Sequence, residues 1–494
     1  MKLSRMFVMA GLASVLGTTA LQAADYYIAP QKAGPVAGAA LAAITLQATK
    51  TSRLRDSVVQ SGNGSAKWVS VNKSTTTTTT TTTTDTTAAP TPTALSLQAP
   101  SSTNTYASFA SLAASKKLVG GDTVLFMAGY HGMLTVSGQN FTTPVTLMAA
   151  PGAVAQVDAI VVTASTKIVI KDLKVWTSGA TTTVTNQIKS DANTTDITFQ
   201  NLDVRAAPTS VNYVNWDLAT WTSNKRNGIE MKGTRNSAIG NRVTGVNFGI
   251  MASGNGALIE KNIIDGFSGD GMRALGDNSV IRGNRVQNCV RIDTNHADGF
   301  QSWSRGPNGA GSGTVYNLTI EGNKFYEWNN PTVSPLKCKL QGVGMFDGMY
   351  DGVKVFNNLV SSTQYHGITI AGALNTVINN NTVTAPTTTK LNYPWIKIAY
   401  HKNGTPSQNV RVSNNTSNGM GVPASTVNNV VATNNILITN SAAEFVSPTG
   451  QNYELLPTAR SANSGLAAYA PPVDILGIPR PRGSAPDAGA YESY

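Results

Sequence analysis

Two short sequence marks recur along this chain at the spacing of one coil of a parallel β-helix. A glycine followed by an apolar residue recurs at Gly228, Gly249, Gly271, Gly299, Gly344 and Gly367. An asparagine that opens a short apolar strand recurs at Asn241, Asn262, Asn284, Asn323, Asn358 and Asn381. Successive glycines lie 21, 22, 28, 45 and 23 residues apart, so the longest step needs a long loop or an extra turn. The repeat predicts an all-β rod of parallel strands with ladders of stacked polar side chains.

The N-terminal residues have the pattern of a secretory signal. Lys2 and Arg5 precede an apolar run over residues 7–16, and small residues suited to cleavage follow. We therefore expect residues 1–23 to be a signal peptide and the protein to be periplasmic or secreted. For the rest we expect an N-terminal strand and loop segment over 24–70, a Thr-rich disordered loop over 71–105, a capping helix over 106–119, the β-helix over 120–450 and a C-terminal segment packed on the last coils over 451–494.

Charge and cysteine content narrow the partners of such a protein. The 494 residues carry a formal net charge of +11, which favours anionic partners such as acidic polysaccharide. There is no cluster of Arg and Lys interleaved with aromatic residues, so nothing supports nucleic-acid binding, and no later segment is long and apolar enough to span a bilayer. Cys289 and Cys338 could pair in an oxidising compartment. We expect a monomer that acts on acidic polysaccharide.

Three features of the chain resemble one superfamily. They are the Gly-Asp-Thr-Val-Leu-Phe run at 121–126, the asparagine-marked coils, and the Pro-Asp-Ala-Gly-Ala-Tyr-Glu ending at 486–492. Together they resemble the pectin-lyase-like superfamily over about residues 120–494. The resemblance implies a single-stranded right-handed parallel β-helix, here with an N-terminal capping helix. Because the superfamily includes polysaccharide lyases, glycoside hydrolases, uronan C5-epimerases, tailspikes and adhesins, the resemblance does not choose a reaction.

Aligning the coils on their glycines places a set of reactive side chains on one outer face. Strand alternation directs to this face Asp270, Arg273, Asp298, Gln301, Trp303, His366 and Lys397, with His296 beside them. Coils stack ~4.8 Å apart, so Asp270 and Asp298 should be close neighbours. Two carboxylates at such a separation raise the pKa of one of them or recruit a cation. A Ca²⁺ ion held by Asp270, Asp298 and Asp293 therefore stays open, although no compact calcium motif is present.

Three reactions compete for this face. β-Elimination of a uronic-acid polymer needs a base for the C5 proton and a cation for the carboxylate. The base could be His296, His366, Lys397, Tyr365 or Tyr400, and Arg273 or Lys397 could be the cation. A polygalacturonase-like hydrolase would use Asp270 and Asp298 as its acid and base. A uronan C5-epimerase shares the first half of the elimination, so the sequence does not separate it from a lyase.

We expect an exported polysaccharide lyase. His296 or His366 would be the base, Arg273 and Lys397 would neutralise carboxylates, and Asp270 and Asp298 would orient the base or hold a cation. The substrate-binding residues would be Gln301, Trp303, Tyr350, Tyr365 and Tyr400. The alternative outside enzymology is a polysaccharide-binding or adhesive rod, on which the aromatic side chains form a sugar-stacking strip.

Overall fold

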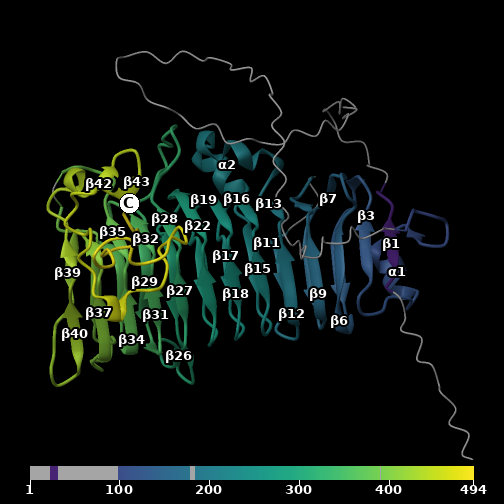
Figure 1. Ribbon diagram of the computed structural model, residues 1–494. Coiled ribbons are helices and arrows are strands. Elements are labelled where there is room, and N and C mark those ends of the chain that lie inside the picture. Colours follow the sequence, from purple (N-terminus) through teal and green to yellow (C-terminus); the bar gives the residue numbers. More distant parts are fainter. Residues whose placement is uncertain (1–22, 32–97, 179–183, 390, 494) are drawn as a thin grey trace, which may run out of the picture. The chain divides into compact units, whose positions relative to one another are not determined.

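The computed structural model describes residues 23–31, 98–178, 184–389 and 391–493. The predicted signal peptide up to residue 22, the predicted N-terminal segment from residue 32 and the predicted Thr-rich loop up to residue 97 lie outside these residues. Within the described part, the strands form the coils of a parallel β-helix whose three long sheets run the length of the stack (Figure 1). The predicted fold class is confirmed.

A regular coil contributes one strand to each sheet, and neighbouring strands pair in parallel. Sheet 1 consists of β1 (Asp25–Ile28), β2 (Thr105–Tyr106), β3 (Thr123–Phe126), β6 (Asn140–Ala149), β9 (Thr166–Lys171), β12 (Thr195–Gln200), β15 (Ser237–Ile239), β18 (Leu258–Glu260), β21 (Val280–Arg282), β26 (Thr314–Tyr316), β27 (Thr319–Glu321), β30 (Met349–Asp351), β31 (Lys354–Phe356), β34 (Ala373–Asn379), β37 (Gln408–Ser413) and β40 (Val430–Thr433). Sheet 2 consists of β4 (Gly129–Tyr130), β7 (Ala155–Val157), β10 (Lys174–Val175), β13 (Asp203–Arg205), β16 (Arg242–Val246), β19 (Ile263–Phe267), β22 (Arg285–Cys289), β28 (Lys324–Tyr326), β32 (Leu359–Ser361), β35 (Thr382–Thr384), β38 (Thr416–Ser417) and β41 (Ile436–Leu437). Sheet 3 consists of β5 (Leu134–Ser137), β8 (Ile160–Thr163), β11 (Asn186–Ser190), β14 (Asn227–Met231), β17 (Ile250–Ala252), β20 (Met272–Ala274), β23 (Asp298–Trp303), β29 (Gln341–Asp347), β33 (His366–Ala371), β36 (Trp395–Ala399) and β39 (Gly419–Gly421).

The short elements lie outside these sheets. They are the hairpins β24 (Arg305–Gly306) with β25 (Gly309–Ala310) and β42 (Phe445–Ser447) with β43 (Asn452–Leu455), and the helices α1 (Phe109–Ala114), η1 (Pro208–Asn215), α2 (Leu218–Ser223), η2 (Ser441–Ala443) and η3 (Ala467–Tyr469). Helix α1 is shorter than the helix expected over 106–119, because Tyr106 belongs to β2. Its Phe109 and Leu112 are buried in the core of the β-helix. No helix among the described residues is both long enough and apolar enough to cross a membrane.

The core consists of inward-pointing apolar side chains that stack in columns from coil to coil. In sheet 3 one such column pairs Ile229, Ile250, Met272, Phe300, Val343 and Ile368 across successive strands, and all six are fully buried. Each such apolar side chain contributes roughly 1.5–3 kcal/mol by leaving water. The predicted alternation of inward and outward residues therefore holds, and the outward residues of sheet 3 form one continuous face.

The alignment of one coil differs from the prediction by two residues. Val343 pairs with Phe300 and Ile368, so Gly342 and not Gly344 occupies the position of Gly299 and Gly367. The repeat exists because a Cβ at this position would overlap the next coil: at Gly249 it would collide with the Gly271 carbonyl oxygen, and at Gly342 with that of Gly367. The 45-residue step contains loops and not an extra turn, since β23 and β29 pair directly.

The recurring asparagines form a buried ladder. Each side-chain oxygen accepts from both the backbone N–H and the side-chain amide of the preceding asparagine, as Asn323 does from Asn284 at 3.0 and 2.9 Å. The ladder runs through Asn241, Asn262, Asn284, Asn323, Asn358, Asn381, Asn415 and Asn435. It satisfies backbone groups at a turn that every coil repeats, which explains why asparagine recurs there.

Candidate active site

The outer face of sheet 3 brings most of the predicted site residues together. Outward positions on successive paired strands are Arg273, Gln301, Gly344, Thr369 and Lys397. The strand starts beside them place Asp270 before β20, Asp298 at the start of β23, Gln341 at the start of β29 and His366 at the start of β33. Sequence analysis missed Gln341, because the alignment on Gly344 put Val343 in its place.

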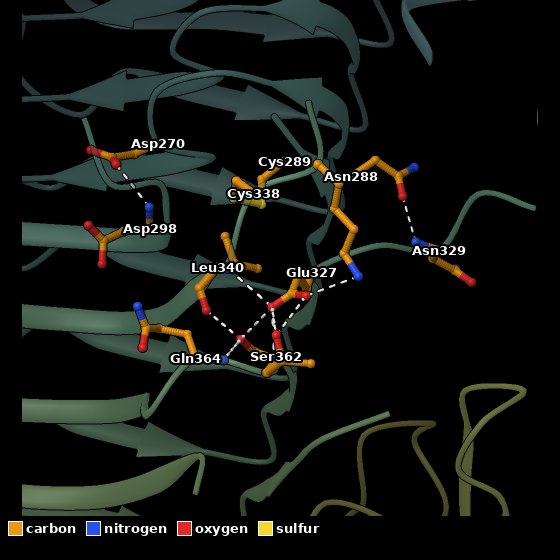
Figure 2. The surroundings of a disulfide bond; sticks show 12 residues. Asp270, Asn288, Cys289, Asp298, Glu327, Asn329, Cys338, Leu340, Ser362 and Gln364 are labelled. Atoms are coloured by element: carbon orange, nitrogen blue, oxygen red, sulfur yellow. Dashed lines mark hydrogen bonds and ion pairs between the residues drawn. A yellow bond between two sulfur atoms is a disulfide. The ribbon is translucent and has the colours of Figure 1, made fainter. Parts of the chain in front are cut away.

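Asp270 and Arg273 form a rigid ion pair at one end of this face. The buried Asp270 carboxylate accepts from Arg273 Nε at 2.6 Å and from the backbone N–H of Asp298 at 3.0 Å. Figure 2 shows the second of these bonds. The Arg273 guanidinium carbon lies 3.9 Å from the centre of the Phe248 ring and 5.1 Å from that of Trp303. Burial raises the pKa of Asp270, and Arg273 opposes that rise. Arg273 is therefore a fixed cation on the outer face.

His296 and Asp298 form a hydrogen-bonded pair in the next coil. His296 Nδ1 lies 3.1 Å from Asp298 Oδ2, and the amide of Gln301 donates to the same oxygen at 3.3 Å. The Asp298 side chain is fully buried, whereas the His296 side chain is 56% exposed. The hydrogen bond to Asp298 raises the pKa of His296. A proton on Nδ1 that donates to Asp298 leaves the Nε2 lone pair free, which is the arrangement of an oriented general base.

The second oxygen of Asp298 has an unusual environment. Burial raises the pKa of Asp298 to about 7. Asp298 Oδ1 and Gln341 Oε1 are buried acceptors without a donor among the described residues, and the two residues pair across β23 and β29. A proton on the Asp298 carboxyl would remove its charge and turn one of its oxygens into a donor. Gly344 permits the approach of this carboxyl, because a Cβ there would lie 2.7 Å from Asp298 Oδ1.

His366 lies in an aromatic cluster further along the face. Its ring centre is 4.3 Å from that of Tyr365, 4.9 Å from that of Phe346 and 5.6 Å from that of Trp395. Its Nδ1 lies 2.9 Å from the hydroxyl oxygen of Thr369. Burial, and then the charges of Lys397 and His296, lower the pKa of His366 to about 4. His366 is therefore neutral at neutral pH and a much weaker base than His296.

The coil spacing separates the two predicted cations. Arg273 and Lys397 stand four pairing steps apart, so ~19 Å lies between their backbones at ~4.8 Å a step. An ion pair needs its charged atoms within about 4 Å, so Arg273 and Lys397 serve different carboxylates. Asp298 and Asp270 are one step apart, as predicted, because no extra turn intervenes.

Two of the predicted sugar-binding tyrosines lie elsewhere. Tyr350 is fully buried in β30 of sheet 1, and its hydroxyl donates to the Ser302 carbonyl oxygen at 2.8 Å. It is a core residue, so the prediction that it stacks on sugar is wrong. Tyr400 follows the end of β36 and is exposed, beside a small cavity that Ser407 and Asn428 also line. The third, Tyr365, is exposed and its ring centre lies 5.1 Å from that of Trp395.

Asp270, Asp298 and Asp293, the candidate ligands for Ca²⁺, do not form a calcium site. Asp293 is exposed and pairs with Lys225 Nζ at 2.7 Å, a bond that lowers the pKa of Asp293. Both oxygens of Asp270 are already bonded to donors, whereas Ca²⁺ requires about six to eight free oxygen ligands. The described residues contain no group of three or more His, Cys, Asp or Glu side chains that could hold a metal. These donors do not fit Ca²⁺.

Loops behind the face hold its strands in place. Cys289 and Cys338 form a disulfide, which ties residue 338 to the end of β22 (Figure 2). Next to it the buried Glu327 carboxylate accepts from Lys337 Nζ at 3.1 Å, from the backbone N–H of Leu340 at 3.3 Å and from that of Thr363 at 2.9 Å. Leu340 leads into Gln341, and residues 362–365 lead into His366. Glu327 was not singled out by sequence analysis, since a lone glutamate carries no pattern.

Comparison with known proteins bears on the fold. Residues 227–393 match the family model described as the right handed beta helix region. Similar solved structures include pectate lyase Pel9A (13% identity, 78% of this chain and 90% of that chain covered, TM-score 0.39) and a mannuronic-acid-specific family 6 polysaccharide lyase from human gut microbiota (14%, 61% and 76%, 0.36). Another is the A-module of the Azotobacter vinelandii mannuronan C-5 epimerase AlgE6 (13%, 66% and 93%, 0.35). The search of curated proteins found no match. The fold is thus the right-handed parallel β-helix, and the low TM-scores carry no argument about activity.

Proposed function

We propose that this protein is an exported enzyme that cleaves a uronic-acid-containing polysaccharide by β-elimination. The observation that carries the proposal is His296, an exposed imidazole whose Nδ1 is held by the buried Asp298, one coil from the fixed cation of Arg273. A base and a cation on adjacent coils are the two groups that this elimination needs.

In the proposed reaction, His296 Nε2 takes the proton from C5 of the uronate. The C–H electrons form the C4–C5 double bond, the bond from C4 to the glycosidic oxygen breaks, and that oxygen leaves with the electron pair. Negative charge builds on the uronate carboxylate during proton removal, where the guanidinium of Arg273 stabilises it. The imidazolium formed at His296 then returns a proton to the departing oxygen, so no proton is gained or lost overall.

The other reactions find less support on this face. Hydrolysis needs two carboxyl groups that flank the scissile bond, but Asp270 is buried and both its oxygens are engaged. An epimerase needs a second proton donor on the opposite face of C5, and the lowered pKa of His366 leaves that ring without a proton to donate at neutral pH. A purely adhesive rod would gain nothing from a buried carboxyl that orients an exposed imidazole.

Export belongs to the same proposal. The N-terminal pattern of a basic region, an apolar run and small residues is typical of a secretory signal. The Cys289–Cys338 disulfide also supports it, since such bonds persist in oxidising compartments. Detection of the protein in the periplasmic or culture fraction, with its N-terminus near residue 24, would test this part. Retention of the intact chain in the cytoplasm would contradict it.

The test of the reaction is the ultraviolet absorbance of the unsaturated uronate that elimination creates. The protein is mixed with a panel of polyuronates, and the same panel is given to His296→Ala. We expect a rise with at least one polymer, its loss in the variant and its partial return when free imidazole is added. New reducing ends without absorbance would establish hydrolysis instead, and undiminished absorbance in His296→Ala would remove His296 from the mechanism.

A further inference from the structure

We infer that Lys397, Trp395 and Tyr365 form a second carboxylate-binding subsite, which holds a uronate unit of the same polymer away from the bond that is cleaved. The inference rests on the proposed function, because it takes an acidic polysaccharide as the ligand. In this inference Lys397 increases the affinity for longer substrates, whereas Arg273 neutralises the carboxylate of the unit that reacts.

The position of Lys397 excludes it from the reacting unit. Lys397 on β36 is the fourth pairing step from Arg273 on β20, about 19 Å away at the spacing of stacked coils. It is three steps from Gln301, which bonds to the same oxygen of Asp298 as His296. Arg273 already holds the carboxylate of the unit whose C5 proton His296 removes, so Lys397 at this distance contacts the carboxylate of another unit.

The charge of Lys397 is available to a ligand. Among the residues that the structure describes, no carboxylate or other hydrogen-bonding partner engages its Nζ, which lies 5.2 Å from the centre of the Trp395 ring. Arg273, by contrast, is held by Asp270. The rings of Trp395 and the exposed Tyr365 stand 5.1 Å apart beside this ammonium. An aromatic surface next to a cation suits a sugar ring that carries a carboxylate.

The surface between the two cations accepts an anionic chain. The intervening outward positions are Gln301, Gly344 and Thr369, none of which is charged. In the other direction from Arg273, the same column continues with Met251 and then Glu230, whose carboxylate pairs with Lys232 Nζ at 3.3 Å. A polyanion that has one carboxylate at Arg273 therefore meets no carboxylate in this column on its way to the ammonium of Lys397.

This arrangement makes the contribution of Lys397 depend on substrate length. Oligomers long enough to reach from His296 to Lys397 gain the second ion pair, and shorter ones do not. The gain appears in binding and not in the chemical step, since Lys397 is remote from the bonds that change. Removing the charge while keeping the aliphatic stem over Trp395 should therefore raise KM for long substrates and leave kcat nearly unchanged.

The experiment compares the full enzyme with Lys397→Met on uronate oligomers of graded length. We expect KM for long oligomers to rise roughly tenfold with kcat within about twofold, as the loss of one charge-assisted contact predicts, and no change for the shortest cleaved oligomers. Lys354→Met on sheet 1 is the control, because it removes the same charge from an exposed site on another sheet. A fall in kcat at every length, or an unchanged KM for long oligomers, would overturn the inference.

A binding measurement separates this inference from the proposed reaction. His296→Ala and the double variant with Lys397→Met are run in affinity gels that contain either the polyuronate or the same polymer with its carboxyl groups reduced to alcohols. We expect Lys397→Met to weaken retention by the charged polymer alone. That result would support the subsite even if no elimination were ever detected. Equal weakening with both polymers would show that Lys397 does not bind a carboxylate.

Discussion

Replacing Asp298 by asparagine tests whether a buried carboxyl sets the basicity of His296. The substitution keeps the shape of the side chain and removes its charge. The oxygen of the introduced amide, in place of Oδ2, still accepts from His296 Nδ1, and its NH₂ group replaces Oδ1, an oxygen that has no donor among the described residues. What is lost is the charge of the hydrogen bond that raises the pKa of His296, so that pKa should fall.

The expected gain in stability follows from the burial of Asp298. Burial raises its pKa from the ordinary 3.8 to about 7, and at about 1.4 kcal/mol per pH unit this makes the ionised carboxyl destabilising by roughly 4 kcal/mol. Because the folded protein holds this proton more tightly than the unfolded chain, stability decreases as pH rises from about 4 to about 7. The variant has no such carboxyl, so it should melt higher than the wild type at pH 8 by several degrees and differ little at pH 4.

The activity should change in the opposite direction. His296 acts as a base only when neutral, so wild-type kcat/KM should rise with pH through a pKa above 6.5. In Asp298→Asn this rise should move to lower pH, and the plateau should fall by about 10²–10⁴-fold, the size of effect seen when an imidazole loses its orienting carboxylate.

Calorimetry at pH 4 and pH 8 and a pH profile of kcat/KM check both sides of this prediction. Asp203→Asn is the control, since Asp203 lies on sheet 2, is partly exposed and pairs with Arg205 at 2.6 Å. It should leave the pH profile unchanged. A lower melting temperature for Asp298→Asn at pH 8, or an unshifted pH profile, would refute the account of the pair.

Three further substitutions test the scaffold around the site. Asn323→Leu removes one rung of the ladder and leaves the backbone N–H and the side-chain amide of Asn284 without their acceptor, so thermal unfolding should show a loss of about 2–6 kcal/mol. Replacing Cys289 and Cys338 together by Ser opens a loop of 49 residues and should lower the stability by about 4 kcal/mol. In calorimetry, reductant should lower the melting temperature of the wild type and leave that of the Ser variant unchanged. Tyr350→Phe should lower stability by about 0.5–1.5 kcal/mol through its lost hydrogen bond and leave kcat/KM unchanged; a change in KM would restore Tyr350 as a sugar contact.

The coil repeat could be predicted from sequence because each coil imposes the same local demands. A Cβ at Gly249 or Gly271 would collide with the neighbouring coil, and from Asn241 onward the turn before each sheet 2 strand holds a side chain that both donates and accepts. Glycine and asparagine meet these demands, so the marks recur at the coil period. Strand alternation then separates inward from outward residues, which is why Asp270, Arg273 and Asp298 could be placed on one face.

The error at Gly344 shows what such a repeat does not determine. Gly342 and Gly344 have the same orientation in the strand, and an apolar residue follows each of them. A slip of two residues keeps every side chain on its own face, so hydrophobic alternation does not detect it. The slip hid Gln341, the partner of Asp298, and it hid the reason for Gly344. Tyr350 was misplaced for a related cause, because the long loops before it conceal which strand it joins.

Comparison of the coils with one another argues that the buried carboxyls serve chemistry. The position at the start of each sheet 3 strand is occupied by Asn186 and Asn227 in two early coils, by Phe248 in the next coil and by Gln341 after the site. The fold therefore accepts uncharged side chains at this position. The two coils between them carry Asp270 and Asp298 at this position, and both carboxyls have raised pKa values because they are buried. Burial of an ionisable group lowers stability unless partners offset it. Here the partners are the fixed Arg273 and the exposed His296, which is where a cation and a base are needed together.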